Sequence, residues 1–258
     1  MEIITSEHNP LLKDVRKASS RGGLTSEGFA VAEGFHLLDE ALAAGLEIGA
    51  VMVSESRAAS VEMDRLKPVP RIVKDSVFNS LSSTETPQGV LSLVRLKQWS
   101  LDDTKGEGPA LILVLDEIQD PGNAGAMARA AEAFGASGIV FLKGSVHAHN
   151  PKCLRGSAGS LFRLPHVERV ETEALHDFFG ANGIALYAAE GKAEQTLDQA
   201  AFSGSCAIAI GSEGRGISRA LAAKATMLRI PTMHVESLNA SVAAGVMLYE
   251  ASRQRRAK

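Results

Sequence analysis

The segment DPGNAGAMAR, residues 120–129, joins a strand-like run to a helical pattern, and it decides how the rest of the chain is interpreted. Residues 111–115 before it are apolar and strand-like, and an alanine-rich helical pattern follows it. Polar side chains therefore stand at the carboxyl end of a strand, where open α/β sheets bind ligands. Asn123 and Arg129 are nearly two helical turns apart, so a helix that begins at Asn123 carries both on roughly one side. The segment predicts a functional site.

A purely structural interpretation covers part of the same segment. Asn is a favoured N-cap and Pro-Gly is a common turn, so residues 120–123 could simply start a helix. Arg129 is different, because it stands among alanines, where a buried guanidinium would need a partner. A functional Arg129 is the interpretation that we favour.

The second informative segment is GSEGRGIS, residues 211–218, which follows the apolar run 206–210. Its glycines let the backbone turn tightly and approach a ligand closely. Two common motifs are excluded, because no Gly-Lys-Ser/Thr is present and the spacing is G-x-x-G-x-G rather than G-x-G-x-x-G. Alone, the segment is equally consistent with a glycine turn followed by a helix capped by Ser218.

The third segment, residues 230–245, reads IPTMHVESLNASVAAG. A strand ends here, a loop follows, and a helix starts near Asn239. Asn239 could be an N-cap or a ligand-binding group, and both can hold because a helix N-terminus also suits a ligand's negative group.

Strand-like and helical runs alternate after residue 110, which predicts a parallel sheet with both faces covered. The expected strands are 111–115, 139–142, 184–188, 206–210 and 227–230, and the expected helices are 124–134, 175–179, 218–224 and 240–255. Residues 1–98 read as a smaller α/β domain with helices at 10–18 and 35–44 and strands at 29–31, 51–53 and 89–94. The polar, glycine-rich residues 99–109 are the expected linker to the second domain, 110–258.

The bulk composition is that of an ordinary globular enzyme, with 258 residues, 45% hydrophobic content and a net charge of −3. This charge argues against a protein that coats nucleic acid non-specifically, although it allows a local basic face. No apolar run has the roughly 20 residues that span a bilayer, and the N-terminus lacks a secretory apolar segment. Two cysteines are too few for a disulfide framework, so we expect a cytoplasmic protein.

The three segments resemble, in order, the three signature motifs of the SpoU (TrmH-type) RNA 2′-O-methyltransferases of the SPOUT superfamily. The matching patterns are N-x-G-x-x-x-R at 123–129, GSEG at 211–214 and ESLN-x-S-x-A at 236–243. NPK at 150–152 and RGSAGS at 155–160 are similar to the family's segment between its first two motifs. FAVAEG at 29–34, with the helix after it, is similar to the small RNA-binding domain that often precedes the catalytic domain. The resemblance covers nearly the whole chain.

The resemblance implies an α/β catalytic domain with a deep trefoil knot, which binds S-adenosylmethionine in a bent shape. It assigns the cofactor to Gly211, Ile230, Ser237, Leu238 and Asn239. It also implies a homodimer formed through the C-terminal domain. An apolar face for that contact is available at Val242, Val246 and Tyr249.

The implied reaction transfers a methyl group to a ribose 2′-hydroxyl, and the residues assigned to it are Asn123, Arg129, Glu213, Ser237 and Asn239. Arg129 matches the family's catalytic arginine. A guanidinium holds its proton too firmly to be a base, so we expect a cationic clamp on ribose and phosphate. Asn123 would orient Arg129 or the ribose, and Glu213 would pair with Arg129 or position the second loop.

The expected partner is RNA, with ribosomal RNA favoured over transfer RNA. We expect Lys152 and Arg155 to contact phosphates. Lys13 and Arg21 belong to a basic strip that suits RNA, although a solvated helix face explains them nearly as well. Two rivals are a catalytically silent RNA-binding protein on the same scaffold and a dinucleotide-dependent oxidoreductase, against which the missing G-x-G-x-x-G counts.

Two weaker signals favour plain structure. His147 and His149, followed by Cys153, match no strong zinc pattern, so we expect a polar loop and no metal. The basic residues 253–258 are expected to form a frayed, soluble end.

Overall fold

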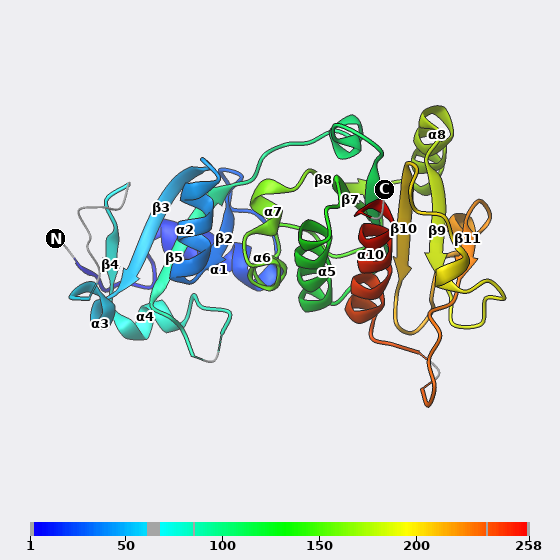
Figure 1. Cartoon of the computed structure of the whole chain (residues 1–258). Helices are drawn as coiled ribbons and strands as arrows, with labels where there is room; N and C mark the ends of the chain where they lie inside the picture. Colours follow the sequence, from blue (N-terminus) through cyan, green and yellow to red (C-terminus); the bar gives the residue numbers. More distant parts are fainter. Residues whose placement is uncertain (1–2, 61–67, 85, 236, 257–258) are drawn as a thin grey trace. The chain divides into compact units, whose positions relative to one another are not determined.

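The chain is described by a computed structural model that covers residues 3–60, 68–84, 86–235 and 237–256. Its internal contacts form two compact units, which are described separately below (Figure 1). The first unit comprises Met1–Lys97 with His149–Arg163, and the second comprises Gln98–Ala148 with Leu164–Lys258. Residues 149–163 thus group with the first unit, although the sequence places them inside 110–258. The domain limits inferred from the sequence stay predictions.

The first unit contains a five-stranded sheet made of β1 (Ile3–Ile4), β2 (Ala30–Glu33), β3 (Glu47–Ser54), β4 (Arg71–Val73) and β5 (Val90–Arg95). The strand order is β1-β4-β3-β5-β2. β1, β4 and β3 pair in parallel, whereas β5 pairs antiparallel with both β3 and β2. The mixed pairing confirms a small α/β unit.

Helices bury both faces of this sheet. They are α1 (Pro10–Arg21), α2 (Phe35–Ala43), α3 (Glu55–Ala58), α4 (Asp75–Asn79), α6 (Pro151–Ser157) and α7 (Ser160–Arg163). Alternate residues of β3 point to opposite faces, as the pleat requires. Met52 therefore packs in one apolar cluster with side chains of α1 and α4, and Val51 and Val53 pack in another with Leu38 of α2.

The second unit contains six strands, β6 (Leu111–Asp116), β7 (Gly138–Leu142), β8 (His166–Val170), β9 (Ala185–Ala189), β10 (Cys206–Gly211) and β11 (Thr226–Leu228). They run in the order β11-β9-β10-β6-β7-β8, and every neighbouring pair is parallel. All residues of β6 and β7 are buried, as expected for strands covered on both faces. The predicted parallel sheet is confirmed.

In the described part of this unit, the α-helices are α5 (Pro121–Ala133), α8 (Thr172–Asn182), α9 (Arg219–Ala222) and α10 (Ala240–Arg256). The single turns Asp102–Lys105 and Leu197–Gln199 are 3₁₀-helical. α5 and α10 lie side by side, and α10 also contacts β10 (Figure 1). Phe134, at the end of α5, meets Tyr249 of α10 edge to face, with 5.7 Å between the ring centroids.

The start of α5 differs from the prediction. Asp120, not Asn123, is the N-cap, and its Oδ1 accepts a hydrogen bond from the Asn123 backbone N–H at 2.6 Å. Pro121 takes the first helical position, where its missing N–H costs nothing. The Asn123 side chain is therefore not used as the cap and is available to the site.

The prediction that residues 253–258 form a frayed end is wrong for residues 253–256, which form the last turn of α10. The Arg255 guanidinium donates hydrogen bonds of 2.6–2.9 Å to four backbone carbonyls, those of Pro109, Ala110, Phe202 and Gly204. These carbonyls precede β6 and β10, so Arg255 fixes the last turn of α10 to the amino edge of the sheet. Residues 257 and 258 lie outside the described part of the chain.

None of the described helices is long and apolar enough to cross a membrane. The trefoil knot implied by the resemblance stays an expectation.

Candidate active site

The three segments singled out in the sequence meet at the carboxyl edge of the parallel sheet, within the second unit. They follow β6, β10 and β11. A cavity of about 230 Å³ opens between them. Its lining includes Glu117, Asp120, Asn123, Ser212, Glu213 and Arg215. The structure therefore brings the first two segments around one cavity, with Ala240 contributed by the start of α10.

A hydrogen-bonded network joins one side chain from each segment. Glu213 Oε1 accepts from Asn123 Nδ2 at 3.0 Å and from Asn239 Nδ2 at 2.7 Å. Asn239 Nδ2 also lies 3.2 Å from Asn123 Oδ1. Three of the five residues assigned to catalysis are thus in direct contact. The sequence analysis suggested that Glu213 pairs with Arg129 or positions the second loop. Its observed contacts link the second loop to the first and third segments.

Asn239 is both an N-cap and a member of this network. Its Oδ1 accepts from the backbone N–H of Ser241 at 2.9 Å and from the Ser241 hydroxyl at 2.6 Å, which caps α10. Its Nδ2 faces Glu213. The start of α10 is therefore tied to the second loop by one side chain.

Arg129 takes no part in this network. It lies exposed on α5, and the described residues provide it with no hydrogen bond or ion pair. The reasoning that a buried guanidinium would need a partner does not apply, because the side chain faces solvent. An exposed cation on the helix that carries Asn123 is available to an anionic ligand. Its catalytic role stays a prediction.

The sequence analysis did not identify Arg215, a cation that lines the cavity. Arg215 Nη2 lies 3.2 Å from Glu117 Oε2. Glu117 follows β6 and has a φ of +54°, an uncommon backbone conformation for a residue with a side chain. Arg215 belongs to the second segment and Glu117 lies three residues before the first, and nothing in their spacing indicates that they pair.

The residues assigned to the cofactor surround the same edge. Gly211, Ile230 and Leu238 are half-buried, and Ser237 is exposed. The hydroxyl of Ser212, directly after Gly211, is buried and has no hydrogen-bond partner in the part of the chain that the structure describes. A buried hydroxyl without a partner is costly. This orphaned group beside Gly211 fits a site that a polar ligand completes.

Apart from Arg129, the residues assigned to RNA phosphates belong to the first unit. Lys13 and Arg21 on α1 and Lys152 on α6 are exposed. Arg155 is engaged within the protein, because its Nη1 donates to Ser83 Oγ at 3.0 Å and lies 3.7 Å from Glu33 Oε2.

Glu33 explains why Arg155 is held there. Its side chain is only 3% exposed. Its carboxylate accepts hydrogen bonds from the Ser83 backbone and hydroxyl, from Thr84 Oγ1 at 2.7 Å, and from Ser82 Oγ. A buried carboxylate needs such partners. The sequence indicated the motif that contains Glu33, but not this role.

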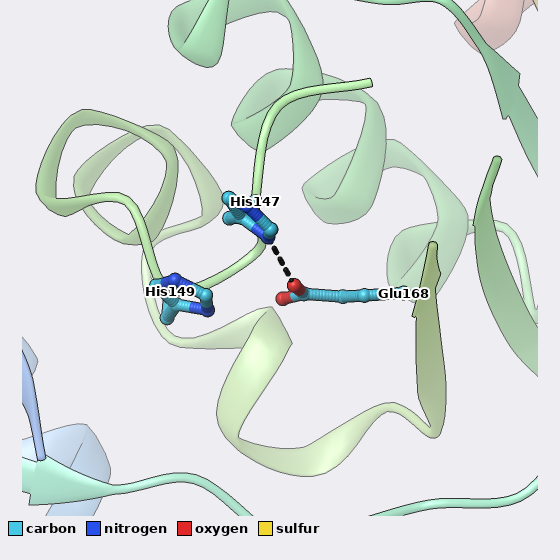
Figure 2. Close-up of side chains that lie close together, drawn as sticks. All are labelled: His147, His149 and Glu168. Carbon is cyan, nitrogen blue, oxygen red and sulfur yellow. Dashed lines mark hydrogen bonds and ion pairs between the residues drawn. The ribbon is translucent and has the colours of Figure 1, made fainter. Parts of the chain in front are cut away.

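The loop after β7 carries the histidines considered as metal ligands. Figure 2 shows His147 facing Glu168, with 2.7 Å between His147 Nδ1 and Glu168 Oε2. Glu168 Oε1 accepts from the Ala148 backbone N–H, so Glu168 of β8 anchors this loop. His149 is grouped with the first unit. The absence of a metal stays a prediction.

Both cysteines are free thiols and are buried. Burial raises the pKa of the Cys206 thiol, although the nearby Arg255 guanidinium acts in the opposite direction. A thiol with a raised pKa stays protonated at neutral pH and is a poor nucleophile. Cys206 is therefore a packing residue.

Two family models match the chain. The model described as the SpoU rRNA Methylase family matches residues 110–249, and the model described as an MRM3-like substrate binding domain matches residues 9–92. The first match contains all three segments of the site, and the second lies within the first unit.

Curated relatives match over nearly the full length of the chain. An uncharacterised tRNA/rRNA methyltransferase of Synechocystis, slr1673, is 36% identical and is aligned over 97% of this chain and 93% of its own length. The 23S rRNA (guanosine(2553)-2′-O)-methyltransferase RlmP of Bacillus subtilis is 30% identical, over 96% of this chain and 98% of its own.

Solved structures show the same fold. The crystal structure of an RNA 2′-O ribose methyltransferase superposes with a TM-score of 0.84 at 31% identity, covering 99% of this chain and 100% of the other. An rRNA methyltransferase from Sinorhizobium meliloti with bound AdoMet gives a TM-score of 0.83 at 27% identity, covering 98% and 97%.

Proposed function

Because this chain belongs to the SpoU rRNA methylase family and is an S-adenosylmethionine-dependent RNA 2′-O-methyltransferase, we propose that it methylates ribosomal RNA through the Asn123–Glu213–Asn239 site and Arg129. The single observation that carries the assignment of the site is the network in which Glu213 joins the first and third segments. A silent RNA-binding protein has no need to hold these three polar side chains in one hydrogen-bonded network.

The preference for ribosomal over transfer RNA rests on RlmP, a relative that matches both halves of the chain. RlmP, aligned over 98% of its length, is named for a guanosine of 23S rRNA. The family model for the second half is also described by rRNA. The name of slr1673 includes both kinds of RNA, so transfer RNA is the second candidate. The nucleotide that is methylated follows from neither name.

The proposed chemistry begins with the position of the ribose. When bound, S-adenosylmethionine supplies an electrophilic methyl group on a sulfonium. Arg129 binds the phosphate next to the target ribose and stabilises the negative charge that develops on the 2′-oxygen. A guanidinium keeps its proton at neutral pH, so the 2′-hydroxyl proton passes to an oxygen of the bound phosphate. Asn123, Glu213 and Asn239 keep the surrounding loops in place.

The cofactor is assigned to the second and third segments. Gly211, Ile230 and Leu238 would contact it largely through backbone groups, while Ser237 would support the third loop. The Ser212 hydroxyl beside Gly211 supports this placement, because it is buried, has no hydrogen-bond partner among the described residues, and would be satisfied by a polar atom of a bound cofactor. The oxidoreductase alternative finds no support in the family or in its structures.

We also infer a homodimer through α10. Val242, Val246 and Tyr249 are spaced four and three residues apart, so they lie along one side of the helix. These side chains are 50%, 36% and 49% exposed, which is unusual for three large apolar side chains on one side of a helix. A second copy of this helix is the partner that we propose. A cytoplasmic location stays a prediction.

The experiment that tests this function uses ribosomal and transfer RNA from cells that lack the protein. Each RNA is incubated with the purified protein and S-adenosylmethionine with a labelled methyl group, and 2′-O-methyl nucleosides are then identified after digestion. We expect label in ribosomal RNA only. Label in transfer RNA would favour the second candidate, and no label in either would favour the silent RNA-binding protein.

A further inference from the structure

We propose that Asp116 is a positioning residue for methyl transfer, because its buried carboxylate fixes the loop 211–218 that presents Glu213. This inference rests on the proposed function. Asp116 is the last residue of β6 and is 2% exposed. Its Oδ2 accepts a hydrogen bond of 2.6 Å from the Ser218 backbone N–H. Nothing in the three motif resemblances assigns a role to Asp116.

Asp116 contacts both ends of this loop. On the sheet, Asp116 is the register partner of Gly211, where β10 ends and the loop begins. Through its side chain it holds Ser218, where the loop ends and α9 begins. One residue of β6 therefore fixes both the departure and the return of the loop.

The loop is folded too tightly to change shape freely. The Gly216 N–H donates to the Ser212 carbonyl at 2.8 Å, and Gly216 has a φ of +67°. A Cβ on Gly211 would stand 2.2 Å from the Gly216 carbonyl group, so the two ends of the turn are in direct contact. Because the turn is closed in this way, the positions of its two ends determine where Glu213, at its tip, is held.

The other side-chain contact that we find from this loop to the β6 end is weaker. Arg215 meets Glu117 at 3.2 Å, but the Arg215 side chain is 70% exposed. Solvent screens such a pair, so it contributes little. The Asp116 carboxylate is buried and its hydrogen bond to the Ser218 N–H is short, so this contact is the one that sets the loop against β6.

The experiment compares Asp116→Leu with Asp116→Asn. Leucine has a similar size but leaves the Ser218 N–H without an acceptor, whereas asparagine retains one oxygen. We expect kcat of Asp116→Leu to fall about tenfold or more, and Asp116→Asn to recover to within about threefold of the unmodified protein. Hydrogen exchange of peptides that cover residues 212–219 should accelerate in Asp116→Leu and change little in Asp116→Asn.

A general loss of stability is separated from positioning in two ways. Thr104→Val removes the side-chain hydrogen bond of another buried polar residue of the second unit, from Thr104 Oγ1 to the Leu101 carbonyl, and should lower the unfolding temperature without lowering kcat. In a Glu213→Ala background, Asp116→Leu should cause little further loss of kcat, because both changes remove the same positioned group.

The outcomes distinguish the two proposals. An unmodified protein that transfers no methyl group to RNA would overturn the proposed function. Active wild-type protein with an unchanged kcat in Asp116→Leu, or fully additive losses in the double variant, would overturn the role of Asp116 alone. Unchanged exchange at residues 212–219 would show that the Asp116 bond does not hold the loop.

Discussion

Glu213 illustrates how much of the site follows from residue type and order. The sequence placed polar side chains after three strands, and parallel strands bring such ends to one edge. The meeting of Glu213 with Asn123 and Asn239 is consistent with that placement. The sequence did not predict that Glu213 pairs with the two asparagines, because the charged Arg129 is the more obvious partner for a carboxylate. Only the structure shows Arg129 facing solvent.

The exposed Arg129 supports a prediction about rate. Arg129→Ala should lower kcat for methyl transfer about a hundredfold or more, because it removes the cation proposed for the phosphate and the developing oxyanion. Binding of S-adenosylmethionine, measured by calorimetry, should stay within about threefold, because the cofactor is assigned to other loops.

Arg219→Ala is the matched control for Arg129→Ala. Arg219 is an exposed arginine of the same unit, on α9, outside the network. Its replacement should leave kcat unchanged. Near-wild-type turnover by Arg129→Ala on the RNA that the unmodified protein methylates would refute the proposed role of Arg129.

Single replacements of Lys152 and Arg155 should have different effects, the first on RNA binding and the second on stability. Lys152→Gln removes an exposed charge, so the slope of log affinity for RNA against log salt should flatten by about one, with no change in the unfolding temperature. Arg155→Gln should lower the unfolding temperature, because it removes the cation that lies 3.7 Å from the buried Glu33 carboxylate. A stable Arg155→Gln protein would show that Glu33 does not depend on this pair.

Among the elements, the buried strands were the easiest to predict. β6 and β10 are near-continuous apolar runs, and the predicted ranges differ from the observed ones by only one residue at the carboxyl end. β8 was missed because its sequence, HVERV, mixes charges with apolar residues on an edge of the sheet. Its register also shifts near Arg169, which has a φ of +57°. The spacing of apolar residues in this segment therefore does not indicate a strand.

The end of α10 supports a prediction about stability. Arg255→Ala should destabilise the protein by roughly 2 to 4 kcal/mol, because four carbonyls at the amino edge of the sheet lose a charged donor. Thermal and denaturant unfolding would measure the loss. Arg256→Ala, one residue further on the same turn, is the control, because Arg256 is exposed. Equal effects of the two changes would contradict a specific role for Arg255.

At the scale of the whole molecule, the sequence predicted two α/β parts but assigned residues 149–163 to the second of them. The contacts group this segment with the first unit, where α6 packs against β2 and Arg155 meets Glu33. Order along the chain could not indicate this, because the segment is flanked on both sides by strands of the second unit. A buried glutamate that needs a distant cation is invisible until both ends of the pair are in place.

The exposed stripe on α10 gives the prediction for the assembly. Val246→Glu should convert a dimer into monomers in sedimentation velocity, because the proposed contact would bury the new charge without a partner. Leu42→Glu is the matched control, since Leu42 is a similarly exposed apolar residue, 41% against 36%, on α2 of the first unit. It should leave the dimer intact. An unmodified protein that sediments as a monomer at every concentration would refute the dimer, and a dimeric Val246→Glu protein would place its interface away from this stripe.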